Sequence, residues 1–95
     1  MTKIICNISE DTIYFEVLEH TGTEACIAVS SCCNVLVTYL DALGVEVDVY
    51  EPGHVKYDIV LNEYIACCEI ELIFKAVYTT LQAASEEFKG QIKIY

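Results

Sequence analysis

The sequence predicts an α+β fold of two helices packed on one mostly antiparallel sheet, with the element order ββαββαβ. Two segments, 23–43 and 62–89, place apolar residues at every third or fourth position, as amphipathic helices do. The other apolar segments are short, rich in β-branched residues and separated by turn residues, as strands are. With 95 residues, 55% of them hydrophobic, the chain can form one compact domain over residues 1–95.

The first half of the chain predicts a hairpin followed by a helix. Segments 3–8 and 12–20 read as strands joined by a turn at 9–11. The helix at 23–43 is indicated by an apolar stripe formed by Ala25, Val29, Cys32, Leu36, Leu40 and Leu43. Gly44 follows this stripe, where a glycine commonly ends a helix.

The second half repeats this order and adds a strand. Segment 45–61 alternates apolar and polar residues around a Pro-Gly turn at 51–54, which predicts a second hairpin. Asn62 is the predicted cap of the second helix, which ends at Lys89-Gly90. Its apolar stripe consists of Ala66, Ile70, Ile73, Val77, Leu81, Ala84 and Phe88. Segment 91–95 completes the sheet as a short strand.

The charge balance is strongly acidic. Five lysines, no arginine and fifteen carboxylates give a formal net charge of -10. This charge repels nucleic-acid phosphates, so no direct nucleic-acid binding is expected. It attracts cationic molecules and favours a basic protein or peptide as partner. The acidity also has a simpler reading, in which it only keeps an apolar protein in solution.

The N-terminus lacks the apolar segment of a secretory signal, and we expect a cytoplasmic protein with reduced cysteines. The longest apolar stretches are interrupted by polar residues, so no membrane span is expected. No glycine-rich phosphate loop is present, and we expect no cofactor.

Cys26 lies near the start of the first predicted helix. Thr21 and Glu24 form a T-x-x-E pattern typical of a capping box, although Thr23 is an equally good cap. In either case Cys26 falls within the first turns, where backbone N–H groups and the helix dipole favour a thiolate. His20 precedes Cys26 by six residues, and a turn at Gly22 can bring the imidazole to the sulfur. Cys–His nucleophilic enzymes use such a pair, whereas a cysteine at this place is more often a small buried residue.

These residues resemble the bacterial ribosomal-processing cysteine proteases. Residues 20–22, His-Thr-Gly, match the family's His-x-Gly element, and residues 26–30, Cys-Ile-Ala-Val-Ser, match its Cys-Ala-Ala-Val-Ser. The element order and the Leu-Gly-Val at 43–45 fit the family over nearly the whole chain. Family members are small homodimers that remove an N-terminal extension from the basic large-subunit ribosomal protein twenty-seven.

By this resemblance the catalytic residues are His20 and Cys26, and Gly22, Thr23, Glu24 and Ser30 support the site or bind substrate. The chain also departs from the family pattern. Glu19 replaces the glycine before the histidine, Thr23 replaces an acidic residue, and the His-to-Cys loop is about six residues shorter than in the family. The resemblance therefore implies a divergent cysteine endopeptidase or, alternatively, a catalytically silent dimeric relative that binds protein.

The remaining constellations favour structural roles. The other five cysteines are expected to pack in the core, since the adjacent pairs at 32–33 and 67–68 lack zinc-ligand spacing, and no metal is expected. His54, in the Pro-Gly turn, is expected to face solvent. Val37, Tyr39 and Ile65 are candidates for a dimer seam.

Overall fold

The protein is described by a computed structural model that covers residues 2–18 and 24–95. Two helices and a five-stranded sheet follow one another in the order ββαββαβ, which confirms the predicted α+β class. The elements are β1 (Thr2–Ile8), β2 (Thr12–Leu18), α1 (Glu24–Ala42), β3 (Val49–Glu51), β4 (His54–Val60), the 3-10 turn η1 (Leu61–Glu63), α2 (Cys67–Glu87) and β5 (Ile92–Ile94).

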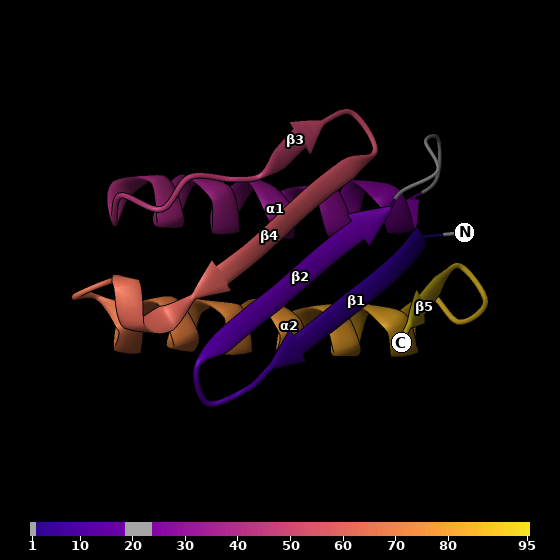
Figure 1. Ribbon diagram of the computed structural model, residues 1–95. Helices are drawn as coiled ribbons and strands as arrows, with labels where there is room; N and C mark the ends of the chain where they lie inside the picture. Colours follow the sequence, from indigo (N-terminus) through magenta and orange to yellow (C-terminus); the bar gives the residue numbers. More distant parts are fainter. Residues whose placement is uncertain (1, 19–23) are drawn as a thin grey trace.

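The sheet has the strand order β3-β4-β2-β1-β5, with β3 and β5 at its edges. Neighbouring strands are antiparallel except β5, which runs parallel to β1. Both helices lie side by side on the same face of the sheet and run in opposite directions, and the strands cross them obliquely (Figure 1). The architecture is therefore two layers, a helix pair and a sheet, with the core between them.

The core is formed by alternate residues of the strands and one face of each helix. In β2, Ile13, Phe15 and Val17 are fully buried, while the residues between them lie on the opposite face. Phe74 of α2 packs its ring against Phe15, at 5.6 Å between ring centroids, and against Tyr57 of β4, at 5.5 Å. These aromatic contacts join α2 to the centre of the sheet.

The buried face of α1 differs from the predicted stripe at three positions. Its buried residues are Ala25, Cys26, Val29, Cys33, Leu36 and Leu40. Cys33 takes the place that the sequence analysis gave to Cys32, which is only partly buried. Cys26 is added, and the partly buried Leu43 lies beyond the end of the helix. A helix turns 100° per residue, so residues spaced three or four apart share only an approximate face. The sequence pattern therefore locates the buried face with an uncertainty of about one residue.

Gly44 terminates α1, as predicted. The Gly44 backbone has a φ of +81°, and its N–H donates to the carbonyl of Asp41 at 3.0 Å. The N–H of Val45 donates to the carbonyl of Leu40 at 2.9 Å, and both side chains are buried. This pair of bonds is a Schellman motif, which requires a left-handed residue after the helix.

The second hairpin is shorter than predicted on its first side. Segment 45–48 was expected to begin a strand, but β3 comprises only Val49–Glu51. Val45 is buried with 2% exposure, as the alternation indicated. The N–H of Val45 is bonded to the end of α1 and not to β4, so Val45 is buried without taking part in the sheet.

The predicted cap of the second helix, Asn62, is wrong. Residues 61–63 form the separate turn η1, and α2 begins at Cys67 after Ala66, which caps it without a side-chain hydrogen bond. The Leu61 side chain is buried, and its N–H donates to the carbonyl of Asp11 at 2.8 Å. This hydrogen bond to the β1–β2 turn holds η1 against the sheet, so α2 begins later in the sequence than predicted.

α1 is long and apolar enough to cross a membrane by length and composition alone, which the sequence analysis did not expect of any segment. The core helix of a globular domain has the same two properties. One face of α1 is buried against the sheet, and α1 lies beside α2 along its length (Figure 1). The packing accounts for the apolar character of this face.

The buried Tyr57 hydroxyl has no hydrogen-bond partner among the described residues, and burial raises the pKa of Tyr57. A buried polar group without a partner costs about 1–3 kcal/mol. We therefore expect Tyr57→Phe to keep the free energy of unfolding or raise it by about 1 kcal/mol, as measured by urea denaturation. Tyr57→Ala, which also removes the ring contact with Phe74, should lose about 3–5 kcal/mol. A loss above about 1 kcal/mol in Tyr57→Phe would show that the hydroxyl is bonded.

Candidate functional site

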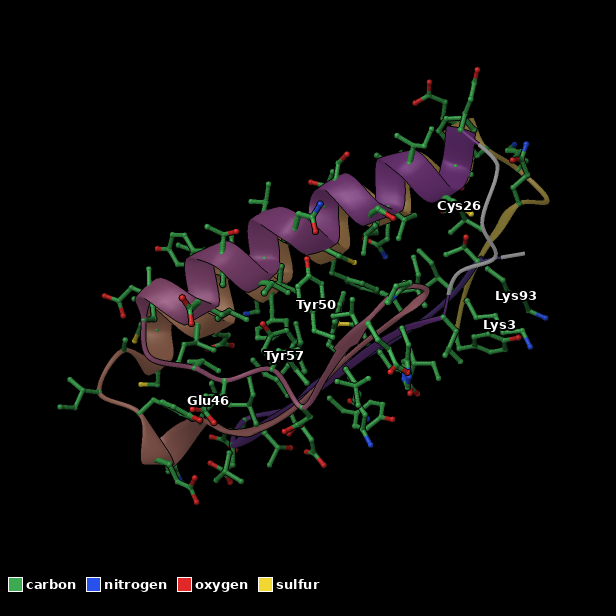
Figure 2. The ribbon with its side chains drawn as sticks, turned by 90° about the horizontal axis from the view of Figure 1, so that it is seen from above. Lys3, Cys26, Glu46, Tyr50, Tyr57 and Lys93 are labelled. Carbon is green, nitrogen blue, oxygen red and sulfur yellow. The ribbon has the colours of Figure 1, made fainter. Side chains whose placement is uncertain are left out.

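Cys26 is the third residue of α1 and faces the sheet. Its side chain is 7% exposed, and Sγ lies 3.5 Å from Oγ1 of Thr2, the first residue of β1, which is 1% exposed. Figure 2 shows the Cys26 sulfur below the end of α1, on the side of the sheet. The N-terminal turn of a helix carries unpaired N–H groups that stabilise negative charge. Cys26 therefore combines a position that suits a thiolate with a largely enclosed side chain.

The predicted partners of Cys26 are only partly described. His20, Gly22 and Thr23 lie outside the described residues, so the His20–Cys26 pair remains a prediction. Glu24 is the exposed first residue of α1. Ser30 follows Cys26 by about one turn and is partly buried.

A cavity of about 310 Å³ lies farther along α1, between the helix and the β3–β4 hairpin. Asn34 and Tyr50 connect its two walls, because the Tyr50 hydroxyl donates to Oδ1 of Asn34 at 2.6 Å. Figure 2 shows Tyr50 reaching from the hairpin toward α1. The cavity is lined by Ser30, Cys33 and Asn34 of α1 and by Tyr50, Glu51, Pro52, Gly53, His54 and Val55. Ser30 thus connects the cavity to the helical turn that carries Cys26.

His54 is not the solvent-facing residue that the sequence analysis expected. Its side chain is 27% exposed, and Nε2 lies 2.7 Å from Oε2 of Glu16 on β2. Nδ1 lies 3.8 Å from Glu51. The hydrogen bond with His54 holds the pKa of Glu16 below its usual value, and a second bond comes from the Tyr14 hydroxyl at 3.0 Å. This pairing depends on the β2–β4 register, which places Leu18 opposite His54 and so brings Glu16 diagonally near it.

The expectation that the other cysteines pack in the core is wrong for Cys68, which is exposed. Cys33 is buried, and Cys32 and Cys67 are partly buried. Partial burial raises the pKa of the Cys6 thiol to about 11. Among residues 2–18 and 24–95, no three His, Cys, Asp or Glu side chains gather as a metal ion would require.

No protein-family model matches the sequence. No curated protein matches it either. Solved structures do match, and two are crystal structures of the essential ribosomal processing protease Prp from S. aureus. The complex with a covalently linked product peptide has a TM-score of 0.75 and 16% identity, over 99% of this chain and 97% of that one. The complex with a substrate peptide has a TM-score of 0.75 and 15% identity, over 100% and 98%.

A third similar structure is SMU.848 from Streptococcus mutans. It has a TM-score of 0.68 and 18% identity, over 99% of this chain and 91% of that one. At these identities the likeness establishes the fold, which extends over practically the whole of each chain. The fold that the resemblance implied is thereby confirmed, while activity is a property of the site and not of the fold.

The lowered pKa of Glu16 makes a prediction about stability. The His54 bond stabilises the folded state above the ordinary carboxyl pKa of 4.5, and this contribution is lost as the pH falls below 4.5 through the lowered value. Glu16→Gln should therefore be less stable than the wild type at about pH 7, and the difference should shrink at about pH 3.5. Urea denaturation of both proteins at each pH measures it.

Glu46→Gln provides the matched control for this experiment, because Glu46 is exposed and loses the same charge. Its stability relative to wild type should change little between the two pH values. A Glu16→Gln difference that stays constant with pH would contradict the role of the pair.

Proposed function

We propose that the protein is a cysteine endopeptidase of the ribosomal-processing type. The observation that carries the proposal is the position of Cys26 at the first turn of α1 in a fold shared with Prp over its whole length. Both Prp structures contain peptides, as a substrate complex or as a covalently linked product. We assign the nucleophile to Cys26 and the general base to His20.

In this mechanism His20 takes the proton of the Cys26 thiol, and the sulfur attacks the peptide carbonyl carbon. N–H groups at the start of α1 stabilise the oxyanion. The C–N bond then breaks as the amine leaves with the proton from the imidazole, and water hydrolyses the resulting thioester. We assign supporting or substrate-binding roles to Gly22, Thr23, Glu24 and Ser30. No cofactor is required.

The proposed substrate is a basic protein in the cytoplasm, such as a large-subunit ribosomal protein with an N-terminal extension. A protein with a net charge of -10 attracts such a chain and accelerates their encounter at low salt. Its charge disfavours direct binding of nucleic acid, and no membrane takes part in the proposed reaction.

A second function is favoured by the burial of Cys26. A side chain with 7% exposure, in contact with Thr2, resembles a packed core cysteine. In this alternative the protein is a catalytically silent relative that binds peptide without cutting it. The two functions differ in whether Cys26 is required for a chemical change in the bound peptide.

The cleavage test uses ribosomal protein twenty-seven with its N-terminal extension, incubated with the protein and measured by intact mass. The wild type should release one defined N-terminal fragment, and Cys26→Ala should release none because the nucleophile is missing. His20→Ala should reduce the rate about a hundredfold or more, since general-base catalysis contributes this much. Circular dichroism checks that both variants are folded.

Cys68→Ser is the matched control, because Cys68 is exposed at the start of α2 and takes no part in the proposed mechanism. It should cut at the wild-type rate. Retention of the intact substrate by the wild type, with binding unaffected in Cys26→Ala, would favour the silent binding module.

We also propose that the protein is a homodimer, joined through the outward face of α1. No charged residue occurs between Glu24 and Asp41, and Ile27, Val35 and Tyr39 are exposed. Val35 borders two shallow hollows, of about 250 and 500 Å³, on the outer surface of the helices. An uncharged apolar face allows two acidic copies to meet without pairing like charges.

The dimer test introduces a negative charge into this face. Val35→Glu should convert the dimer into a monomer, because two copies of the carboxylate would be buried near the symmetry axis. Light scattering coupled to size exclusion measures the mass. Val60→Glu makes the same change on β4, away from α1, and should leave the mass unchanged. A monomeric wild type, or a dimer that survives Val35→Glu, would contradict this seam.

A further inference from the structure

The cavity between α1 and the β3–β4 hairpin has no role in the cleavage chemistry described above. Most of its lining surface is apolar, but each wall carries polar side chains, Ser30 and Asn34 on α1 and Tyr50 and Glu51 on the hairpin. Its volume, about 310 Å³, exceeds what a single long side chain requires. A cavity of this kind beside a proposed protease site suits a side chain of the substrate.

The charge around the cavity is negative. Among the described residues that line it, Glu51 is the one carboxylate, and no lysine lines it. His54 also lines it, but its imidazole lies between Glu16 and Glu51. Even a protonated His54 leaves these groups with a net negative charge. Lys56 is the lysine of β4, and its ammonium lies 5.6 Å above the Tyr14 ring instead of entering the cavity.

The position of the cavity relative to Cys26 indicates how far from the cleaved bond the bound side chain would lie in the peptide. Ser30 and Asn34 follow Cys26 by about 6 and 12 Å along α1, at about 1.5 Å per residue. An extended peptide advances about 3.3 Å per residue. A peptide bound parallel to α1 would therefore place in the cavity a side chain about two to four residues from the bond at the sulfur.

The hairpin also favours an extended peptide. β3 is an edge strand, paired only with β4, so one side of its backbone can pair with an added strand. An edge strand beside a cavity gives both backbone pairing and side-chain selection.

We propose that the cavity is a specificity pocket for a lysine or arginine located about two to four residues from the cleaved bond, with Glu51 as its counter-charge. The inference rests on the proposed peptidase function. The Asn34–Tyr50 hydrogen bond forms the far end of the pocket, and Ser30 lies at the end nearer Cys26.

The test is cleavage of a decapeptide library in which each position carries lysine, leucine or glutamate, with products identified by mass spectrometry. The wild type should prefer lysine at one position within the stated distance of the cut. Glu51→Gln should lower kcat/KM for the lysine peptides about twofold to fivefold and leave the leucine peptides unchanged, as expected for an ion pair with the solvent-exposed Glu51 side chain. Glu51→Lys should shift the preference to glutamate.

Glu46→Gln is the matched control, because it removes one exposed carboxylate from the preceding loop without altering the cavity lining. It should retain the lysine preference. This control distinguishes an effect of the pocket from an effect of the protein's overall negative charge. Cleavage without a basic preference at this distance, or an equal effect of both variants, overturns the pocket and leaves the peptidase function standing.

If no peptide is cut, the peptidase proposal fails, and the pocket is then tested by measuring peptide binding. Fluorescence anisotropy then compares a labelled nonapeptide of alternating serine and lysine with its norleucine counterpart, on Cys26→Ala protein. The pocket is supported if Glu51→Gln, added to Cys26→Ala, weakens binding of the lysine peptide while Glu46→Gln, added in the same way, does not. Equal binding by the two double variants overturns it.

Discussion

The rotation of α1 about its own axis is the constraint on which the rest of the molecule depends. Burial of Val29, Cys33, Leu36 and Leu40 against the sheet fixes this rotation, because turning the helix by one residue would expose half of the stripe. Each fully buried aliphatic side chain contributes about 1.5–3 kcal/mol. Cys26 lies on the same stripe and is therefore directed toward β1, so its enclosure follows from the packing of the whole helix.

The same rotation divides the remaining faces of α1 between two purposes. Ser30 and Asn34 lie at the flank of the helix that meets the β3–β4 hairpin, where the cavity forms. Val35 and Tyr39 lie on the outward face, which is apolar and uncharged. Thirteen of the fifteen acidic residues lie outside α1, which carries only Glu24 and Asp41, at its two ends. The negative charge therefore surrounds the middle of α1 without occupying it.

Sequence reasoning predicted the order of elements because hydrophobic period and turn chemistry are local properties. It failed where a non-local contact decides. The tie of Leu61 to Asp11 displaces the start of α2 from Asn62, and the β2–β4 register gives His54 a carboxylate partner. The cavity could not be predicted from the sequence either, because its walls come from elements that are far apart in the chain. Cys68 was misjudged because an apolar composition at a helix start does not say which side faces the core.

The cavity and the outward face of α1 meet at Asn34. This residue borders the cavity on one side and the hollow beside Val35 and Tyr39 on the other. Its Oδ1 accepts a hydrogen bond from the Tyr50 hydroxyl, so a partner packed on α1 would rest against the residue at the far end of the proposed pocket. Pairing of two copies would then restrict the motion of Asn34 and stiffen the pocket, because side chains confined at an interface lose rotamer freedom. A dimer formed through the proposed seam would thus be linked to the proposed pocket by the Asn34–Tyr50 hydrogen bond, without contact between the seam and Cys26.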